Sequence, residues 1–304
     1  MTETSLSRSI AFRAASRASG ESTRGGFSSR PFAGVVRLAQ YAALILLAGI
    51  VLVPLAATAL GGFKTLGDLR ANPFSLPNVW VWSNYWDILS GARYWRVLGN
   101  SLFIAAFTVF FTLALSSMAA FVFAHLRFFG DRFLLNYLLL GLLFPAATAI
   151  LPLFIKIRDL GLLNSHWGIV LPQAAFALGM GVLLLRNAFR QLPSELLDAA
   201  LIDGCGYFRY FFYITLPLSA PILATVAVIA FVNSWNNYLL PLVVLNSDDR
   251  YPWTLGMMVY QGQYSTAWQL VLAFITLTIL PAVAMFVIAQ KYIVAGLTAG
   301  AVKG

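Results

Sequence analysis

Charged side chains are scarce in this sequence: Asp, Glu, Lys and Arg make up 10% of its 304 residues, against 60% hydrophobic residues. Soluble domains carry roughly a quarter charged residues. The mean hydropathy of +0.80 is far above what a surface facing water would give. The composition therefore excludes an ordinary soluble protein and indicates a chain whose solvent is largely a lipid bilayer.

Residues for metal binding and redox chemistry are almost absent as well. The single cysteine, Cys205, excludes an internal disulfide, a paired-cysteine zinc site and a thioredoxin-type motif. The two histidines, His125 and His166, fall near the ends of predicted helices and have no acidic or cysteine partner at ligand spacing. We therefore expect that this chain itself binds no metal and no cofactor.

The net charge of +9 does not indicate a nucleic-acid partner, because the basic residues are spread along the loops and an N-terminal tail. Residues 1–37 carry six arginines against two glutamates in a background of Ser, Gly and Ala. This composition predicts a basic, disordered, cytoplasmic tail. The tail has no apolar stretch beside a cleavage site, so it does not read as a secretory signal.

Six apolar stretches are long enough to cross a bilayer, which takes about 20 helical residues. An even number of spans places both termini on one side of the membrane. If that side is the cytosol, thirteen of the 20 Lys and Arg residues lie inside, an excess with the sign of the positive-inside rule. The outer loop 63–99 is rich in Trp and Tyr, as expected where a chain meets membrane lipid. The predicted spans are residues 38–62, 101–125, 134–156, 167–189, 219–245 and 268–290, within a transmembrane domain of residues 38–295.

No Asp, Glu, Lys or Arg lies in the middle of a predicted span. A charge at the centre of a membrane helix costs at least about 2.5 kcal/mol and normally marks an ion or proton path. The energy for transport is therefore expected to come from outside this domain. Amides and an indole suit an uncharged, hydroxyl-rich solute, although the amides could instead bond between helices or to backbone freed by proline. The neutral polar residues within spans are Gln173, Asn233, Ser234, Asn236, Asn237 and Tyr238, with Trp235 among them.

The loop between the fourth and fifth predicted spans, residues 191–217, is too polar to cross the membrane and too patterned to be unstructured. A Pro-Ser pair favours a helix start, and Glu195 and Asp198 suit the positive end of the helix dipole. Gly204 with Gly206 favours the helix end. Leucines and alanines at helical spacing give this helix an apolar face, and a second short helix follows. Such a hairpin either inserts into a groove of a partner or lies on its own bundle at the membrane surface.

The loop resembles the signature of the membrane subunits of binding-protein-dependent ABC importers, in which Glu-Ala-Ala is followed at fixed spacing by Gly and then by Ile-x-Leu-Pro. The matching residues are Ala199, Ala200, Gly204, Ile214, Leu216 and Pro217, with Asp198 in place of the usual glutamate and Asp203 before the glycine. The resemblance implies an all-α membrane protein with six transmembrane helices, the type I ABC importer permease fold and a cytoplasmic coupling-helix loop. It assigns coupling to an ATPase to Glu195, Asp198, Ala199, Ala200, Asp203, Gly204 and Gly206.

Within that family the sequence is similar to the maltose- and multiple-sugar-type permeases, through Asn100 to Leu102, residues 145–152, residues 233–241 and a cytoplasmic C-terminal tail of residues 296–304. The tail is characteristic of the second permease of the pair. The resemblance implies as partners a second homologous permease, two ATPase subunits and an extracytoplasmic sugar-binding protein, in the cytoplasmic membrane of a bacterium. ATP and Mg²⁺ would be bound by the ATPase subunits, because this chain has no phosphate-binding glycine loop.

The sequence thus predicts a permease subunit, not an enzyme, that forms half of a sugar path. ATPase closure would move the coupling loop and switch the path between inward-facing and outward-facing states. Two alternatives stay open: an ABC permease for another solute, such as glycerol phosphate esters or polyamines, and a secondary carrier. A charged substrate would require opposite charges in the path. The candidates for lining the path are Asn233, Trp235, Asn236, Asn237 and Tyr238.

Overall fold

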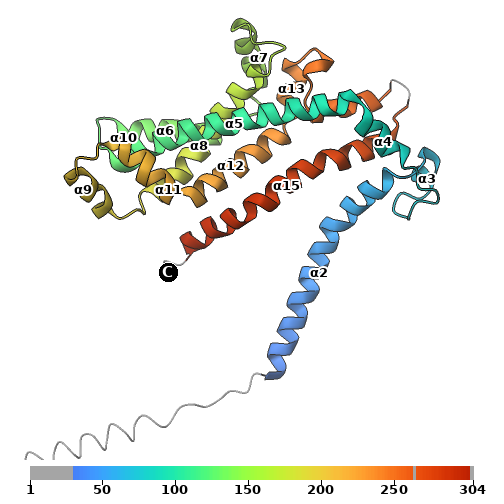
Figure 1. Ribbon diagram of the computed structural model, residues 1–304, viewed down its shortest axis with the longest axis horizontal. Coiled ribbons are helices and arrows are strands. Elements are labelled where there is room, and N and C mark those ends of the chain that lie inside the picture. The colour runs from blue at the N-terminus through green and yellow to red at the C-terminus, as the bar shows by residue number, and fades with distance from the viewer. Residues whose placement is uncertain (1–29, 263–264, 302–304) are drawn as a thin grey trace, which may run out of the picture. The chain divides into compact units, whose positions relative to one another are not determined.

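A computed structural model describes residues 30–262 and 265–301, and over these residues the chain is all-α, as predicted (Figure 1). Within this described part, the one β contact is an isolated bridge between Gln261 and Thr266. The first 29 residues of the predicted tail and residues 302–304 lie outside the described residues. The chain divides into two units, Met1–Pro54 and Leu55–Gly304.

Four predicted spans are single helices that are long and apolar enough to cross a membrane. They are α2 (Arg30–Gly61), α5 (Ala92–His125), α8 (Trp167–Phe189) and α15 (Trp268–Ala301). The first and last helices run past the predicted boundaries at residues 37 and 295. Pro31 lies in the first turn of α2, where a helix tolerates proline. No proline follows Pro281 to end α15 early.

The other two predicted spans are broken. The span 134–156 consists of α6 (Asp131–Leu140), the 3₁₀ turn η1 (Gly141–Leu143) and, after a gap, α7 (Ile150–Asp159). The span 219–245 consists of α12 (Ala220–Trp235) and α13 (Leu239–Val244). Pro145 lies in the first break and Pro241 just after the second, and proline cannot donate a helical hydrogen bond.

The predicted count of six transmembrane helices is therefore not confirmed. By length and composition the described residues contain four such helices, or five if the bent helix pair Tyr207–Leu218 and Ala220–Trp235 counts as one span. That pair bends by 78°, so its first part turns away from the direction of α12. The shorter elements are α3 (Leu66–Ala71), α4 (Ser83–Ser90), α9 (Ser194–Ile202), α10 (Tyr207–Tyr210), the π-helical turn η2 (Phe211–Thr215), α11 (Leu216–Leu218), η3 (Asp248–Arg250), α14 (Trp253–Gly256) and η4 (Met257–Tyr260).

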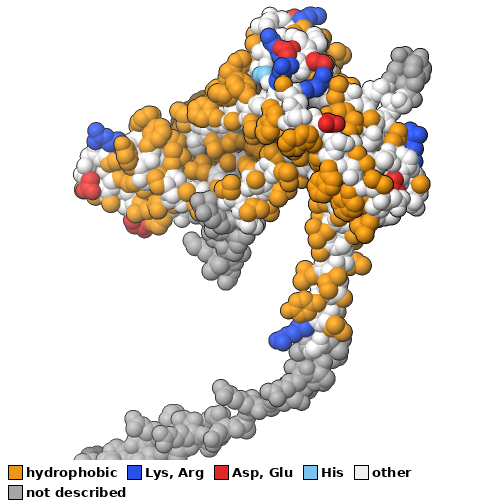
Figure 2. All heavy atoms as spheres, turned by 45° about the vertical axis from the view of Figure 1, so that its right-hand side comes forward, with side chains coloured by type: hydrophobic (Ala, Val, Ile, Leu, Met, Phe, Trp, Pro, Cys, Tyr) orange, Lys and Arg blue, Asp and Glu red, His pale blue; other side chains and the backbone are white. Residues whose placement is uncertain are grey.

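The core of the unit Leu55–Gly304 lies among α5, α8, α12 and α15. A Cβ on Gly181 of α8 would come within 2.8 Å of Ser116 on α5, so the two helices approach closely because a side chain is missing. Figure 1 shows α9 and α10 at one end of α5 and α3 and α4 at the other, with α7 and α13 above α5 in this view. Figure 2 shows hydrophobic side chains over the sides of the helices, with charged side chains gathered at the ends. Such a surface fits lipid and neighbouring subunits instead of water.

Candidate functional site

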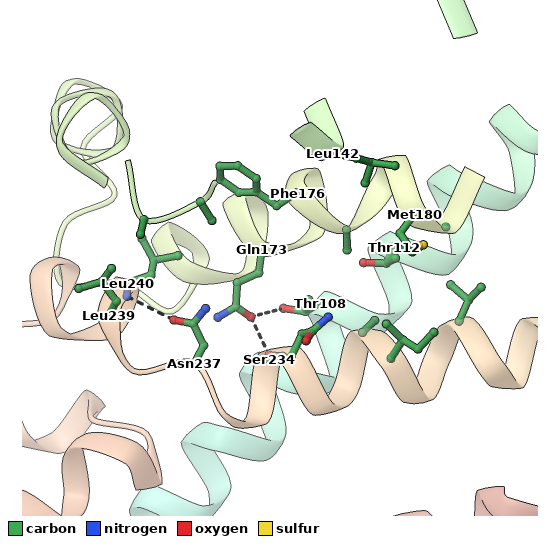
Figure 3. A pocket seen from close by; sticks show the side chains of 18 of the residues that line it. Thr108, Thr112, Leu142, Gln173, Phe176, Met180, Ser234, Asn237, Leu239 and Leu240 are labelled. Carbon is green, nitrogen blue, oxygen red and sulfur yellow. Dashed lines mark hydrogen bonds between the residues drawn. The ribbon is translucent and has the colours of Figure 1, made fainter. Parts of the chain in front are cut away.

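A cavity of about 440 Å³ lies between α5, α8 and α12, beside the breaks in the two interrupted helices (Figure 3). Most of its wall is apolar. None of the described residues that line it is Asp, Glu, Lys, Arg or His. The arrangement can therefore hold a solute through apolar contact and neutral hydrogen bonds. The polar lining residues are Thr108, Thr112, Gln173, Asn233, Ser234 and Asn237.

Both helix breaks open onto this cavity. Ala146 and Ala147 line it from the break between η1 and α7, and Asn237 lines it from the break between α12 and α13. Non-helical backbone at membrane depth is tolerated where it lines a cavity or is buried in protein. Asn237 also supports the first turn of α13, because its Oδ1 accepts a hydrogen bond from the amide of Leu240 at 3.2 Å. The breaks thus place backbone and amide groups where an apolar helix would offer none.

Gln173 is the polar centre of the cavity wall. Its Oε1 accepts hydrogen bonds from Thr108 Oγ1 of α5 at 3.2 Å and from Ser234 Oγ of α12 at 2.6 Å. The amide therefore joins α8 to both neighbouring helices at one level, as Figure 3 shows. Its Nε2 is buried and has no hydrogen-bond partner among the described residues, as is also true of Thr112 Oγ1.

The structure separates the residues that the sequence grouped as candidates for the path. Asn233 and Asn237, one helical turn apart, line the cavity. Trp235 does not: it is 3% exposed, its ring stacks on Phe231 at 5.3 Å, and it belongs to the core between α5, α12 and α15. Asn236 does not line the cavity and donates through Nδ2 to the carbonyl of Val232 in α12. Tyr238 is exposed and is not part of the cavity wall.

Sequence reasoning missed the contribution of α5 to the cavity. Thr108 and Thr112 are four residues apart, and Ser116 continues the same spacing. Residues at this spacing share one helix face. A stripe of hydroxyl groups along an otherwise apolar helix was the signal that could have placed α5 at the cavity.

Asn164 ties together the loops that follow α7 and α13. Its Nδ2 donates to Ser247 Oγ at 2.6 Å, and its Oδ1 accepts from the amides of Asn246 and Ser247 at 3.1 and 3.2 Å. Its own amide donates to the carbonyl of Val244 at 2.8 Å. Asn164 has φ of 51°, in the left-handed region that asparagine tolerates better than most residues. The helices that follow the two breaks are therefore held to each other.

The loop 191–217 forms the helix that the sequence predicts, α9, with Glu195 in its first turn. Its end is a Schellman motif: Cys205 N donates to the carbonyl of Ala200 at 2.8 Å, and Gly204 N to that of Leu201 at 3.1 Å. Gly204 has φ of 75°, which a residue with a Cβ adopts only with strain. This geometry explains the glycine and the sharp turn that follows it.

The residues assigned to ATPase coupling fall into two groups. Glu195, Asp198, Ala199 and Asp203 are exposed, whereas Ala200 is buried against Phe121, Phe189 and Tyr210. Gly206 is extended and precedes α10. Together α9, α10 and η2 expose large apolar side chains to the outside: Ile202 is 86% exposed, Tyr213 78% and Phe208 71%. One side of the hairpin thus packs on its own helix bundle, and the other side is exposed.

Residues 113–298 match the family described as the binding-protein-dependent transport system inner membrane component. This chain belongs to that family. It is therefore a multi-pass membrane protein, in agreement with its long apolar helices.

Curated relatives and a solved structure cover nearly the whole chain. The diacetylchitobiose uptake system permease protein NgcG of Streptomyces coelicolor is 34% identical over 90% of each chain. The arabinooligosaccharides transport system permease protein AraQ of Halalkalibacterium halodurans is 37% identical over 85% of this chain and 93% of the relative. A chain of a bacterial ABC transporter that imports the acidic polysaccharide alginate superposes with a TM-score of 0.75 at 24% identity, covering 90% of this chain and 100% of that one. The fold is that of the ABC importer permeases.

Proposed function

We propose that this chain is a permease subunit of an ATP-driven sugar importer, forming half of the translocation path and transmitting ATPase closure to it. The observation that carries the proposal is α9 with its glycine-ended turn, in a chain of the binding-protein-dependent transport family. The relatives are named as permeases for diacetylchitobiose and arabinooligosaccharides, and their similarity over nearly the whole chain favours a sugar here too.

The exposed side of α9, α10 and η2 is the proposed docking surface for one of two ATPase subunits, which would bind ATP and Mg²⁺. We define this coupling surface by Ile202, Phe208 and Tyr213 with the acidic residues Glu195 and Asp198. Large apolar side chains that stay exposed on a rigid helix are typical of protein interfaces. Ala199 and Asp203 would touch the same partner, while Ala200, Gly204 and Gly206 set the shape of the hairpin.

ATPase closure would be transmitted through the packing of this hairpin. Tyr210 is fully buried and lies between Phe121 of α5 and the rest of the hairpin, with ring centroids 6.2 Å apart. Ala200 lies in the same cluster as Leu185 and Phe189 of α8. Because packed cores transmit displacement instead of absorbing it, a shift of α9 would move the ends of α5 and α8.

The cavity is the proposed half of the sugar path in this subunit, with the other half supplied by a second, homologous permease. Its lining is neutral and offers Asn233 and Asn237 to a solute. A cationic polyamine or an anionic glycerol phosphate ester would lose its water here without gaining an opposite charge, so these solutes are disfavoured. A secondary carrier driven by protons or sodium is disfavoured for the same reason.

The charge bias supports a proposed topology with both termini and the coupling surface in the cytoplasm, with thirteen of the 20 Lys and Arg residues on that side. The loop 63–91 and the loops joined by Asn164 then face outward, where an extracytoplasmic sugar-binding protein would deliver its ligand. A solved alginate importer contains such a periplasmic protein, and this chain superposes on one of its chains with a TM-score of 0.61.

Co-purification from the native membrane tests this function. The tagged chain should recover an ATPase, a second permease and a sugar-binding protein, identified by mass spectrometry, and the complex should show sugar-stimulated ATP hydrolysis. Recovery of the chain alone, with no response to nucleotide, would refute the proposal.

The docking surface is tested with Ile202→Asp, which places a charge on an exposed apolar position of α9. Because Ile202 is largely exposed, its replacement should cost little folding stability. The variant should therefore insert normally but recover much less ATPase. The matched control is Leu76→Asp, an equally apolar exposed position in the loop after α3. Equal ATPase recovery by both variants would place the docking surface elsewhere.

A further inference from the structure

The side-chain amide of Gln173 forms hydrogen bonds through its oxygen only, and its nitrogen has no partner among the described residues. Its Oε1 accepts two hydroxyl hydrogen bonds from two different helices, whereas its Nε2 is buried without a partner among the described residues. A buried N–H₂ group that has lost water and gained no acceptor is unfavourable. An unsatisfied donor in a native structure requires an explanation, such as a water molecule or a ligand that completes the hydrogen bonding.

Gln173 lines the cavity, and its Nε2 is buried within the wall, so a sugar reaches this donor only when the wall opens. Figure 3 shows Gln173 extending from α8 toward α12, between Asn237 on one side and Thr108 and Ser234 on the other. Thr112 Oγ1, one turn along α5 from Thr108, is a second buried polar atom without a partner. Apolar side chains such as Phe176 complete the wall. A few fixed polar groups on an apolar wall suit a sugar ring, which presents hydroxyl groups at its edge and C–H groups on its faces.

The wall also discriminates by charge. None of the described lining residues is Lys, Arg or His, so a uronate carboxylate in this cavity would be desolvated without a cation. A hydroxyl oxygen needs only a neutral donor, which the Gln173 amide supplies. This arrangement favours a neutral glycosyl unit over an acidic one.

We propose that Gln173 is a specificity-determining residue of this subunit, whose Nε2 donates a hydrogen bond to a hydroxyl oxygen of a neutral glycosyl unit in the cavity. The inference rests on the proposed role of the cavity as half of the sugar path. It assigns direct sugar contact to this permease through Gln173 and Thr112, on α8 and α5, together with Asn233 on α12.

The test uses the complete transporter in proteoliposomes, with saturating binding protein and radiolabelled diacetylchitobiose or arabinotriose as neutral probes. The measured quantity is sugar imported per ATP hydrolysed. Gln173→Met keeps the length of the side chain but removes the donor, so this ratio should fall about tenfold, the effect of one lost hydrogen bond. The control is Tyr94→Phe, which removes a buried hydrogen bond from α5 to the carbonyl of Leu277 on α15 and lies outside the cavity wall. The control should lower assembly or total ATP hydrolysis without changing the ratio.

A Gln173→Met complex that imports as much sugar per ATP as wild type overturns the inference, while the proposed function stands. Failure of the wild-type complex to import any neutral sugar refutes the proposed function itself. Import of an alginate oligosaccharide by wild type would overturn the charge discrimination. If Gln173→Met does not assemble, a structure of the wild-type complex trapped with bound sugar decides. A sugar hydroxyl about 3 Å from Nε2 supports the proposal, and a sugar bound away from α8 overturns it.

Discussion

Gly168, at the start of α8, should not tolerate even a methyl group. A Cβ built on it would lie 2.4 Å from the carbonyl oxygen of Leu162, closer than real Cβ contacts come, and 3.1 Å from a methyl of Val244. The carbonyl belongs to backbone that cannot rotate away, because Leu162 N is bonded to the carbonyl of Ile157 at 2.9 Å and Asn164 N to that of Val244 at 2.8 Å. Gly168→Ala must therefore displace the loop between α7 and α8.

The expected loss of stability follows from two opposing effects. Overpacking a well-packed site costs about 1–3 kcal/mol, and the rigid backbone neighbour puts Gly168→Ala near the upper end. Replacing a helical glycine by alanine stabilises the helix by about 1 kcal/mol. The net free energy of unfolding should thus fall by about 2 kcal/mol.

Gly99→Ala in α5 is the matched control, because a Cβ on Gly99 would meet nothing within 4 Å. This control should gain about 0.5–1 kcal/mol from helix propensity alone. Thermal unfolding of the two variants and wild type in the same detergent, followed by size-exclusion chromatography, gives the comparison. If Gly168→Ala melts at or above the wild-type temperature, the close approach of α8 to the loop is refuted.

Two further changes probe the coupling hairpin and the loops at the broken helices. Gly204→Ala has open space for its methyl but forces alanine to φ near 75°, at a cost of about 1 kcal/mol. Limited proteolysis of α9 should therefore speed up, and unchanged cleavage would contradict the Schellman turn. Asn164→Ala removes the side-chain bonds to residues 246–247, so hydrogen exchange at those two amides should rise at least about tenfold. Asn164→Gly is the control, because glycine adopts the left-handed backbone readily but also lacks the side-chain bonds. If the amides of residues 246 and 247 exchange as slowly in this variant as in wild type, the side-chain bonds do not hold the loop.

Local chemistry explains why the hairpin could be predicted in detail. Glu195 at the start of α9 and Gly204 at its end act through the dipole and the backbone of the helix itself. Nothing distant decides these features, so the sequence is sufficient for them. The division between exposed Ala199 and buried Ala200 depends on the position of α5 and α8 against the hairpin, which the sequence does not state.

The residues that line the candidate sugar path, in contrast, could not be identified from the sequence alone. Asn233, Trp235, Asn236 and Asn237 are neighbours in the sequence and equally plausible there as contacts for a sugar. A helix turns 100° per residue, so consecutive side chains face different neighbours. The rotation of α12 against α5 and α8 turns Asn233 to the cavity and Trp235 to the core, and the break after α12 places Asn237 at the cavity.

The sequence by itself determined the solvent of this protein, its helical class and the coupling hairpin, because hydropathy, charge placement and capping act over short stretches of chain. It did not reveal that two apolar stretches break at the cavity, since prolines within membrane helices are compatible with both kinked and interrupted helices. Only the tertiary structure brought Thr108, Gln173 and Ser234 together from three helices. Their hydrogen bonds depend on how those helices pack, and packing is the one property that a linear pattern of residues does not contain.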